Sequence, residues 1–308
     1  MLLSSRTKGH LIALMTVFIW GITYIATKVL LTEFKPIEIL FFRFTLGYAT
    51  LWLLAPRFFA WQGIKQELMF LGAGFCGVTC YFLCENIALT YTTASNVGVI
   101  TTLAPVFTAI LAIFFLKTEK PAKSFYIGCL FSMIGIVLIT INGKFVLSVN
   151  PLGDLLAVFA CLFWAYYSIL TKRSSNYGYN IILLTRRFFF YGLMFMLPAL
   201  YLFDFEWNLS RFNQPVNLLN ILFLGVGASA ICFASWNYAV KLVGAVKISI
   251  YIYLVPILTI INAVLILDEP FTWIAAIGTL FTLSGVLLSE GKIKLKKRLT
   301  CYNLLLTG

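Results

Sequence analysis

The sequence is 308 residues long; 61% of its residues are hydrophobic, 11% are charged, and the formal net charge is +12. Soluble domains carry about a quarter charged residues, so this composition excludes an ordinary soluble protein. So positive a charge would favour a nucleic-acid partner in a soluble chain. Here the basic residues lie mainly in short segments between apolar runs and near the chain end, so we expect no nucleic-acid binding.

Apolar runs that can cross a bilayer follow one another along the whole chain. A hydrocarbon core of about 30 Å needs roughly 20 mainly apolar residues per helix. The first run is too long for a signal peptide and is not followed by a small-residue cleavage site, so we expect it to span. The predicted spans are 9–31, 36–54, 68–89, 95–116, 125–142, 153–170, 180–203, 217–240, 245–267 and 272–289.

The basic residues predict how these spans are oriented. If the N-terminus is cytoplasmic, the inner segments hold 16 lysines and arginines, whereas the outer segments hold only Lys35, Lys144 and Arg211. Cytoplasmic loops of membrane proteins carry an excess of Lys and Arg. We therefore expect a multi-pass protein of the inner (plasma) membrane with both termini cytoplasmic and with residues 290–308 as a basic cytoplasmic tail.

An internal repeat relates the two halves of the chain. An offset of 144 to 151 residues, with the drift that small loop insertions produce, superimposes Trp20 on Trp164, Arg43 on Arg187, Asn86 on Asn237, Pro105 on Pro256, Gly128 on Gly278 and Gly135 on Gly285. Each half holds five predicted spans, an odd number, so the second half must enter the membrane from the opposite side. We expect an all-α membrane protein of ten transmembrane helices, built as two inverted five-helix repeats at 9–142 and 153–289.

Several segments also carry a family resemblance. They are Phe18–Tyr24, Glu85–Asn96 and Leu103–Ala109 in the first half, and Trp236–Ala239, Leu254–Leu258 and Leu267–Pro270 in the second. In order, spacing and duplication they resemble the drug/metabolite transporter superfamily, and within it the EamA-type ten-helix permeases. The resemblance covers nearly the whole chain. It implies an inner-membrane permease, commonly an exporter of amino acids or other small metabolites, but it does not identify the solute.

Charged side chains inside predicted spans are costly in lipid and are therefore candidate functional groups. Glu85 lies within the third span and Arg43 within the second. We expect Glu85 to bind a proton or an amine. Its counterpart in the second half is Trp236, so the repeat places a carboxylate opposite an aromatic wall. The alternative is that Glu85 only pairs with Arg43 and holds two helices together.

Two tryptophans lie near the middle of their spans, away from the interfaces where this residue is usually enriched. These residues are Trp20 and Trp164, which the repeat makes equivalent. Their rings can form the wall of a central pocket that binds an apolar or cationic solute. Simple packing between helices is the alternative.

Two further repeated pairs lie inside spans. Asn86 and Asn237 can donate hydrogen bonds to a solute or to another helix. Pro105 and Pro256 each remove a backbone hydrogen bond in mid-span, which predicts two kinked gating helices. A fixed kink that only improves packing is the alternative reading of the prolines.

The predicted function is transport and not catalysis. His10 is the only histidine, and the sequence lacks zinc and phosphate-loop patterns, so we expect no enzyme activity, metal or cofactor. We expect a secondary transporter that exports a small metabolite by alternating access, with protons as the candidate coupling ion and a homodimer as the candidate assembly. Two alternatives stay open: an uptake or exchange carrier for a nucleotide sugar or phosphorylated solute, and a non-transporting membrane sensor or scaffold.

Overall fold

The computed structural model describes residues 4–91, 97, 100–117, 121–141, 150–258 and 273–289. The helices of the first half are α1 (Ser5–Leu30), α2 (Pro36–Leu54), α3 (Ile64–Gly74), the π-helical segment η1 (Phe75–Cys80), α4 (Tyr81–Tyr91), α6 (Ala104–Phe115) and α7 (Lys123–Ile141). Those of the second half are α8 (Pro151–Ser175), α9 (Ile181–Leu202), the 3-10 helix η2 (Leu209–Asn213), α10 (Pro215–Leu222), the π-helical η3 (Phe223–Ile231), α11 (Cys232–Val243), α12 (Ala245–Ser249), the 3-10 helix η4 (Ile250–Leu254) and α14 (Trp273–Ser289).

The apolar helices match the predicted spans one for one. Among the described residues, six helices are long and apolar enough to cross a membrane: Ser5–Thr27, Pro36–Leu54, Ile64–Tyr91, Pro151–Ser175, Ile181–Leu202 and Pro215–Val243. Four shorter apolar helices occupy the remaining predicted spans: Ala104–Phe115, Lys123–Leu138, Ala245–Leu258 and Ala276–Ser289. The predicted ten-helix membrane architecture is therefore confirmed. The predicted tail at 290–308 lies outside the described residues.

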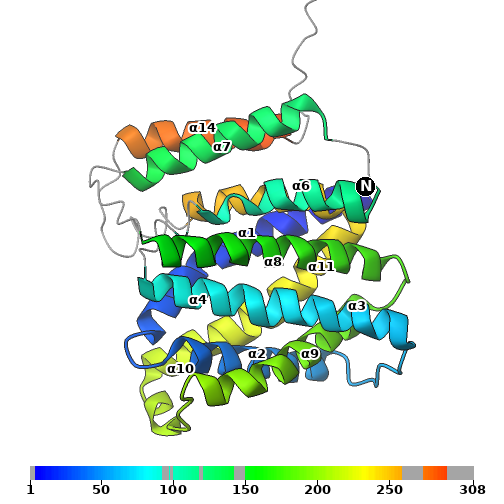
Figure 1. Cartoon of the computed structure of the whole chain (residues 1–308), viewed down its shortest axis with the longest axis vertical. Helices are drawn as coiled ribbons and strands as arrows, with labels where there is room; N and C mark the ends of the chain where they lie inside the picture. The colour runs from blue at the N-terminus through cyan, green and yellow to red at the C-terminus, as the bar shows by residue number, and fades with distance from the viewer. Residues whose placement is uncertain are drawn as a thin grey trace, which may run out of the picture.

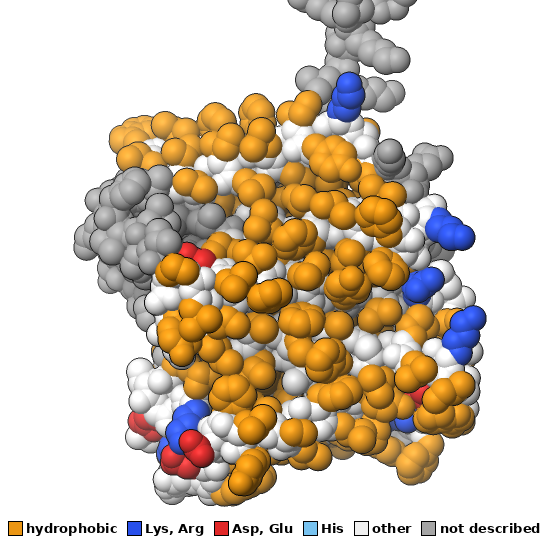
Figure 2. All heavy atoms as spheres, viewed as in Figure 1, with side chains coloured by type: hydrophobic (Ala, Val, Ile, Leu, Met, Phe, Trp, Pro, Cys, Tyr) orange, Lys and Arg blue, Asp and Glu red, His pale blue; other side chains and the backbone are white. Residues whose placement is uncertain are grey.

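The helices lie side by side, with α7 and α14 at the top, α8 in the middle and α2 and α9 at the bottom of Figure 1. In Figure 2, hydrophobic side chains cover the face between the two edges at which the helices end. Lys and Arg gather along the right edge, and charges of both signs lie at the lower left. We call the right edge, where α1, α3 and α9 begin, the basic end. We call the left edge, where α1, α4 and α9 end, the network end, after the polar network described below.

Helices of one half pack against helices of the other. Helix α1 of the first half packs against α11 of the second half. The equivalent helices with the halves exchanged are α8 and α4, and they also pack against each other. Likewise, η1 packs against α9 and η3 against α2, while α2 packs on α9 and α7 on α14. An approximate twofold relation between the halves therefore describes the main contacts of the bundle.

The crossing of α7 and α14 shows the inversion directly. A Cβ atom added to Gly128 would lie 2.5 Å from the carbonyl oxygen of Gly285, and one added to Gly135 would lie 2.5 Å from that of Gly278. Residue numbers rise along α7 as those of the partners fall along α14, so these two equivalent helices run antiparallel. Small residues allow such close approach of helix backbones in membranes. The two repeats are therefore inverted, as predicted.

Each half also contains a π-helical stretch, which hydropathy alone does not predict. An offset of 151 places the six residues of η1 on the last six residues of η3. A π-helix widens a turn and often marks a functional position. In η1, Thr79 Oγ1 donates a hydrogen bond to the Gly192 carbonyl of α9 at 2.8 Å. In η3, the Ala228 carbonyl accepts a hydrogen bond from Trp20 of α1 at 3.1 Å.

Candidate functional site

Three tryptophans from both halves meet at the centre of the bundle. Trp20 lies on α1, Trp164 on α8 and Trp236 on α11. The ring centroids are 5.5 Å apart for Trp20 and Trp164, 5.0 Å for Trp20 and Trp236, and 6.0 Å for Trp164 and Trp236. Trp164 and Trp236 are 4% and 1% exposed, so these two rings are shielded from solvent in this conformation, whereas Trp20 is partly buried.

The indole N–H groups of this cluster are not all satisfied. Trp20 donates its hydrogen bond to the Ala228 carbonyl of η3. The Nε1 atoms of Trp164 and Trp236 are buried, and neither has an acceptor in the part of the chain that the structure describes. A buried donor without an acceptor costs about 1–3 kcal/mol. These two N–H groups are therefore well suited to donate to a bound solute.

Tyr81 links Glu85 to the tryptophan cluster. The Glu85 side chain projects from α4 and is 6% exposed. The Tyr81 hydroxyl, one turn earlier on the same helix, donates a hydrogen bond of 2.7 Å to Glu85 Oε1. The Tyr81 ring in turn lies 5.0 Å from that of Trp164. Tyr81 was not predicted as a site residue, although a spacing of four residues places it on the helix face of Glu85.

Arg43 of α2 lies near Glu85 but is held by other groups. Its Nε atom donates to Ser229 Oγ of η3 at 3.0 Å, and its guanidinium lies 4.5 Å from the centroid of the Phe82 ring. The Arg43 side chain is buried and close enough to Glu85 for their charges to attract. Among the contacts of the described residues, no direct ion pair joins Arg43 to Glu85. The two charges therefore flank the centre without binding each other.

The two equivalent asparagines lie at helix contacts. Asn237 is fully buried; it accepts a hydrogen bond from the Tyr167 hydroxyl at 2.6 Å and donates one to Thr185 Oγ1 at 2.9 Å. Asn86 Nδ2 donates to the Pro36 carbonyl at the start of α2, at 3.4 Å. In this conformation both amides therefore join helices.

The equivalent prolines each stand at the start of a helical stretch. Pro105 lies in the first turn of α6, and Pro256 follows the 3-10 helix η4. Each proline thus lies where the helix of its span is interrupted, and neither kinks a continuous helix. Their part in gating stays a prediction.

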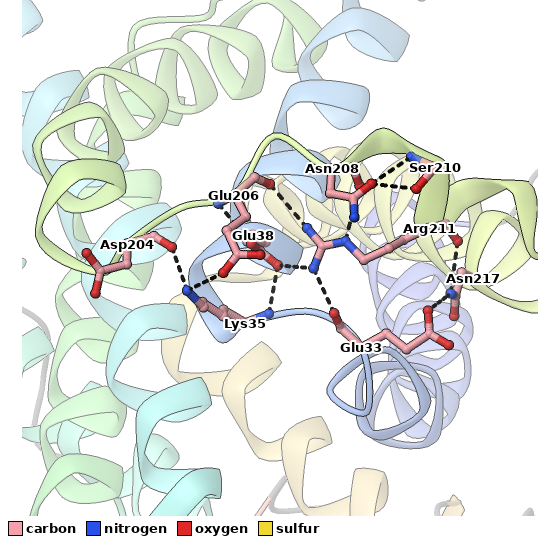
Figure 3. Close-up of polar contacts among 9 residues, drawn as sticks. All are labelled: Glu33, Lys35, Glu38, Asp204, Glu206, Asn208, Ser210, Arg211 and Asn217. Atoms are coloured by element: carbon pink, nitrogen blue, oxygen red, sulfur yellow. Dashed lines mark hydrogen bonds and ion pairs between the residues drawn. The ribbon is translucent and has the colours of Figure 1, made fainter.

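A polar network, which was not predicted from the sequence, closes the network end of the bundle. Figure 3 shows Glu38 and Arg211 at its centre. Glu38 is fully buried; it forms an ion pair of 2.9 Å with Arg211 and accepts backbone N–H bonds from Lys35 at 2.8 Å and Glu206 at 3.0 Å. Arg211 also donates to the Glu33 carbonyl at 2.7 Å. The network therefore joins the α1–α2 turn of the first half to the α9–α10 connection of the second.

An exposed ion pair completes this network. Lys35 Nζ lies 2.8 Å from Glu206 Oε1. Their hydrogen bond raises the pKa of Lys35 and lowers the pKa of Glu206. Both shifts favour the charged forms, so the ion pair persists to below the ordinary pKa of a carboxyl group and to above that of a lysine. Both side chains are largely exposed, so water and salt screen the pair.

A matching contact joins the two halves at the basic end. Glu67 of α3 is 2% exposed, lies 3.3 Å from Arg187 of α9, and accepts a hydrogen bond of 2.6 Å from the Tyr191 hydroxyl. Arg186 donates to the carbonyls of Ala55 and Arg57 in the α2–α3 connection. The repeat makes that connection equivalent to the α9–α10 connection. Each end of the bundle is thus closed around one buried carboxylate.

A membrane-embedded bundle of two inverted repeats around a buried polar and aromatic centre is the architecture of a transporter. The comparisons with known proteins agree with this class. The EamA-like transporter family model matches residues 7–141 and 151–290, and the chain belongs to that family.

Relatives of similar length are also named as transporters. The chain is 30% identical over 292 residues to an uncharacterized transporter of Archaeoglobus fulgidus, covering 93% of this chain and 99% of that one. It is 25% identical to the uncharacterized transporter YcxC of Bacillus subtilis, covering 95% of each. A solved crystal structure, 19% identical, shares the fold with a TM-score of 0.77 over 96% of this chain and all of its own. The protein is thus a multi-pass membrane transporter.

Proposed function

We propose that this transporter is a secondary exporter of a small metabolite of the amino-acid kind, which it moves across the plasma membrane by alternating access. One observation carries the proposal: Trp20, Trp164 and Trp236, contributed by both halves, meet in one cluster, and Tyr81 links that cluster to the buried Glu85. Two similar halves can exchange conformations around such a central site and open it to each side in turn.

The chemistry of the centre supports a solute with an amine, an apolar part and a hydrogen-bond acceptor. The Glu85 carboxylate can bind an ammonium group or a proton. The indole faces attract cations and apolar groups. The unsatisfied N–H groups of Trp164 and Trp236 can donate to a carboxylate or carbonyl. If one proton and the solute compete for Glu85, an inward proton gradient can drive export, which makes protons the proposed coupling ion.

The same centre gives less support to phosphorylated solutes. Such anions need several cations in the cavity, and Arg43 is the one described cation that touches the rings around the cluster. Its equivalent, Arg187, lies at the basic end and is paired with Glu67. The bias of basic residues toward the basic end supports cytoplasmic termini. A homodimer stays a prediction.

The proposal is tested by an untargeted comparison of metabolites in cells and medium. Cells express the wild type, Glu85→Gln, the matched control Glu206→Gln on an exposed carboxylate, or no transporter. We expect one metabolite, or a few related ones, to be enriched in the medium with the wild type and Glu206→Gln alone. Equal enrichment with Glu85→Gln would contradict the role of Glu85, and no enrichment with the wild type would contradict export.

A further inference from the structure

A groove of about 120 Å³ lies between α2 and α9 at the basic end. Aromatic rings, among them those of Trp52, Phe58 and Phe190, line it together with Arg186 and Arg187. It is separate from the central tryptophan cluster and shares none of its residues. Its lining combines positive charge with apolar surface.

The groove carries more positive charge than the acidic side chains of the described residues balance. Arg187 is paired with Glu67 at 3.3 Å. Arg186 donates instead to the uncharged carbonyls of Ala55 and Arg57 and lies 4.3 Å from the centroid of the Trp52 ring. No acidic side chain of the described residues forms an ion pair with Arg186. Two adjacent arginines thus have one carboxylate between them, that of Glu67. An anionic ligand would balance the second positive charge.

The apolar part of the groove faces outward. Phe58 is 90% exposed, and Phe190 is 39% exposed. Leu53, on the last turn of α2, is 84% exposed. Because Phe58 and Phe190 line the groove together with Arg186 and Arg187, an apolar surface lies directly beside the two arginines. A free phosphate ion would contact only the arginines. A phospholipid would contact both the arginines and the apolar surface, because its phosphate is joined to acyl chains. Basic pockets between transmembrane helices bind such head groups.

We propose that this groove binds an anionic phospholipid. Its phosphate lies against the guanidinium of Arg186, and its glycerol and upper acyl chains lie along Phe58 and Phe190. Because Arg186 also holds the carbonyls of the α2–α3 connection, the bound lipid fastens that connection of the first half to α9 of the second. The lipid therefore stabilises the folded protein.

The test measures thermal unfolding of the purified full chain in a non-ionic detergent. Phosphatidylglycerol, phosphatidylcholine with the same acyl chains, glycerol phosphate and inorganic phosphate are added in separate experiments. We expect phosphatidylglycerol to raise the midpoint by roughly 3 °C more than phosphatidylcholine does. Arg186→Gln should lose most of this difference, whereas Arg173→Gln, on an exposed arginine at the end of α8, should keep it.

Three outcomes would overturn the proposal: equal shifts with both lipids, an equal shift with glycerol phosphate or inorganic phosphate, and an undiminished difference in Arg186→Gln. A second measurement needs no variant. Photoreactive phosphatidylglycerol is cross-linked to the wild-type chain, and the labelled peptides are identified. We expect label on peptides that contain Trp52, Phe58 or the first half of α9. Label confined to other segments would contradict the assignment.

Discussion

At the scale of single residues, the buried and exposed ion pairs of the network end have different energetic roles. Glu38 is fully buried and is paired with Arg211, whose side chain is 15% exposed. Lys35 and Glu206 are 42% and 59% exposed. Removing one partner of a buried pair leaves an uncompensated charge, which costs about 3–5 kcal/mol, whereas an exposed pair contributes little.

Glu38→Ala should therefore lower the free energy of unfolding by about 3 kcal/mol or more, measured by thermal or denaturant unfolding in detergent. The matched control Glu206→Ala removes a carboxylate of the same network and should change the unfolding midpoint much less. Similar losses in the two variants would show that the burial of Glu38 does not determine its contribution.

Residue-level roles could be predicted only where one side chain stands out in its span. Glu85, Trp20 and Trp164 do so; the structure brings the two tryptophans together with Trp236 and links Glu85 to them through Tyr81. Glu38 and Arg211 did not stand out, because each lies at or near a span end, where charge is ordinary. Their pairing depends on a contact between loops 173 residues apart, which no local pattern indicates.

At the scale of helices, α7 and α14 approach each other closely at glycines that the repeat makes equivalent. The Cβ that Ala would add at Gly135 lies 2.5 Å from a backbone oxygen of α14, so the helices must separate to accept it. At Gly227 in η3, an added Cβ meets only ordinary contacts, the nearest at 3.6 Å.

Gly135→Ala should therefore destabilise the protein by about 1–3 kcal/mol, whereas Gly227→Ala should be close to neutral. Thermal unfolding of both variants, purified in the same detergent, measures the difference. A midpoint for Gly135→Ala equal to that of the wild type would mean that α7 and α14 do not cross at these glycines.

The helices themselves were predictable, but their irregular turns were not. An apolar run indicates a span of sufficient length, whether the turns of that span are α, π or 3-10. Hydropathy therefore could not predict the π-helical segments η1 and η3 or the 3-10 segment η4. Tertiary contacts favour these turns: Trp20 of α1 donates to a carbonyl inside η3, and Thr79 of η1 donates to α9.

At the scale of the whole molecule, the repeat predicted which segments are equivalent and that the halves are inverted. It could not predict that the halves interleave, because equivalence in sequence does not state which helices touch. Interleaving brings α1 onto α11 and α4 onto α8, and so places tryptophans of both halves in one cluster. It also places one buried carboxylate at each end, Glu38 and Glu67, in contact with the opposite half.

The central claim is that a solute crosses the protein at the tryptophan cluster beside Glu85, and flux into proteoliposomes tests it most directly. The solute found by the metabolite comparison is supplied to liposomes that contain the wild type, Glu85→Gln, Glu206→Gln or no protein, with and without a proton gradient. We predict saturable, gradient-dependent flux for the wild type and Glu206→Gln, and a loss of roughly ten- to a hundredfold for folded Glu85→Gln, because a hydrogen bond to a charged group contributes about 1.5–3 kcal/mol. Wild-type flux no faster than in protein-free liposomes, or undiminished flux through Glu85→Gln, would contradict the account.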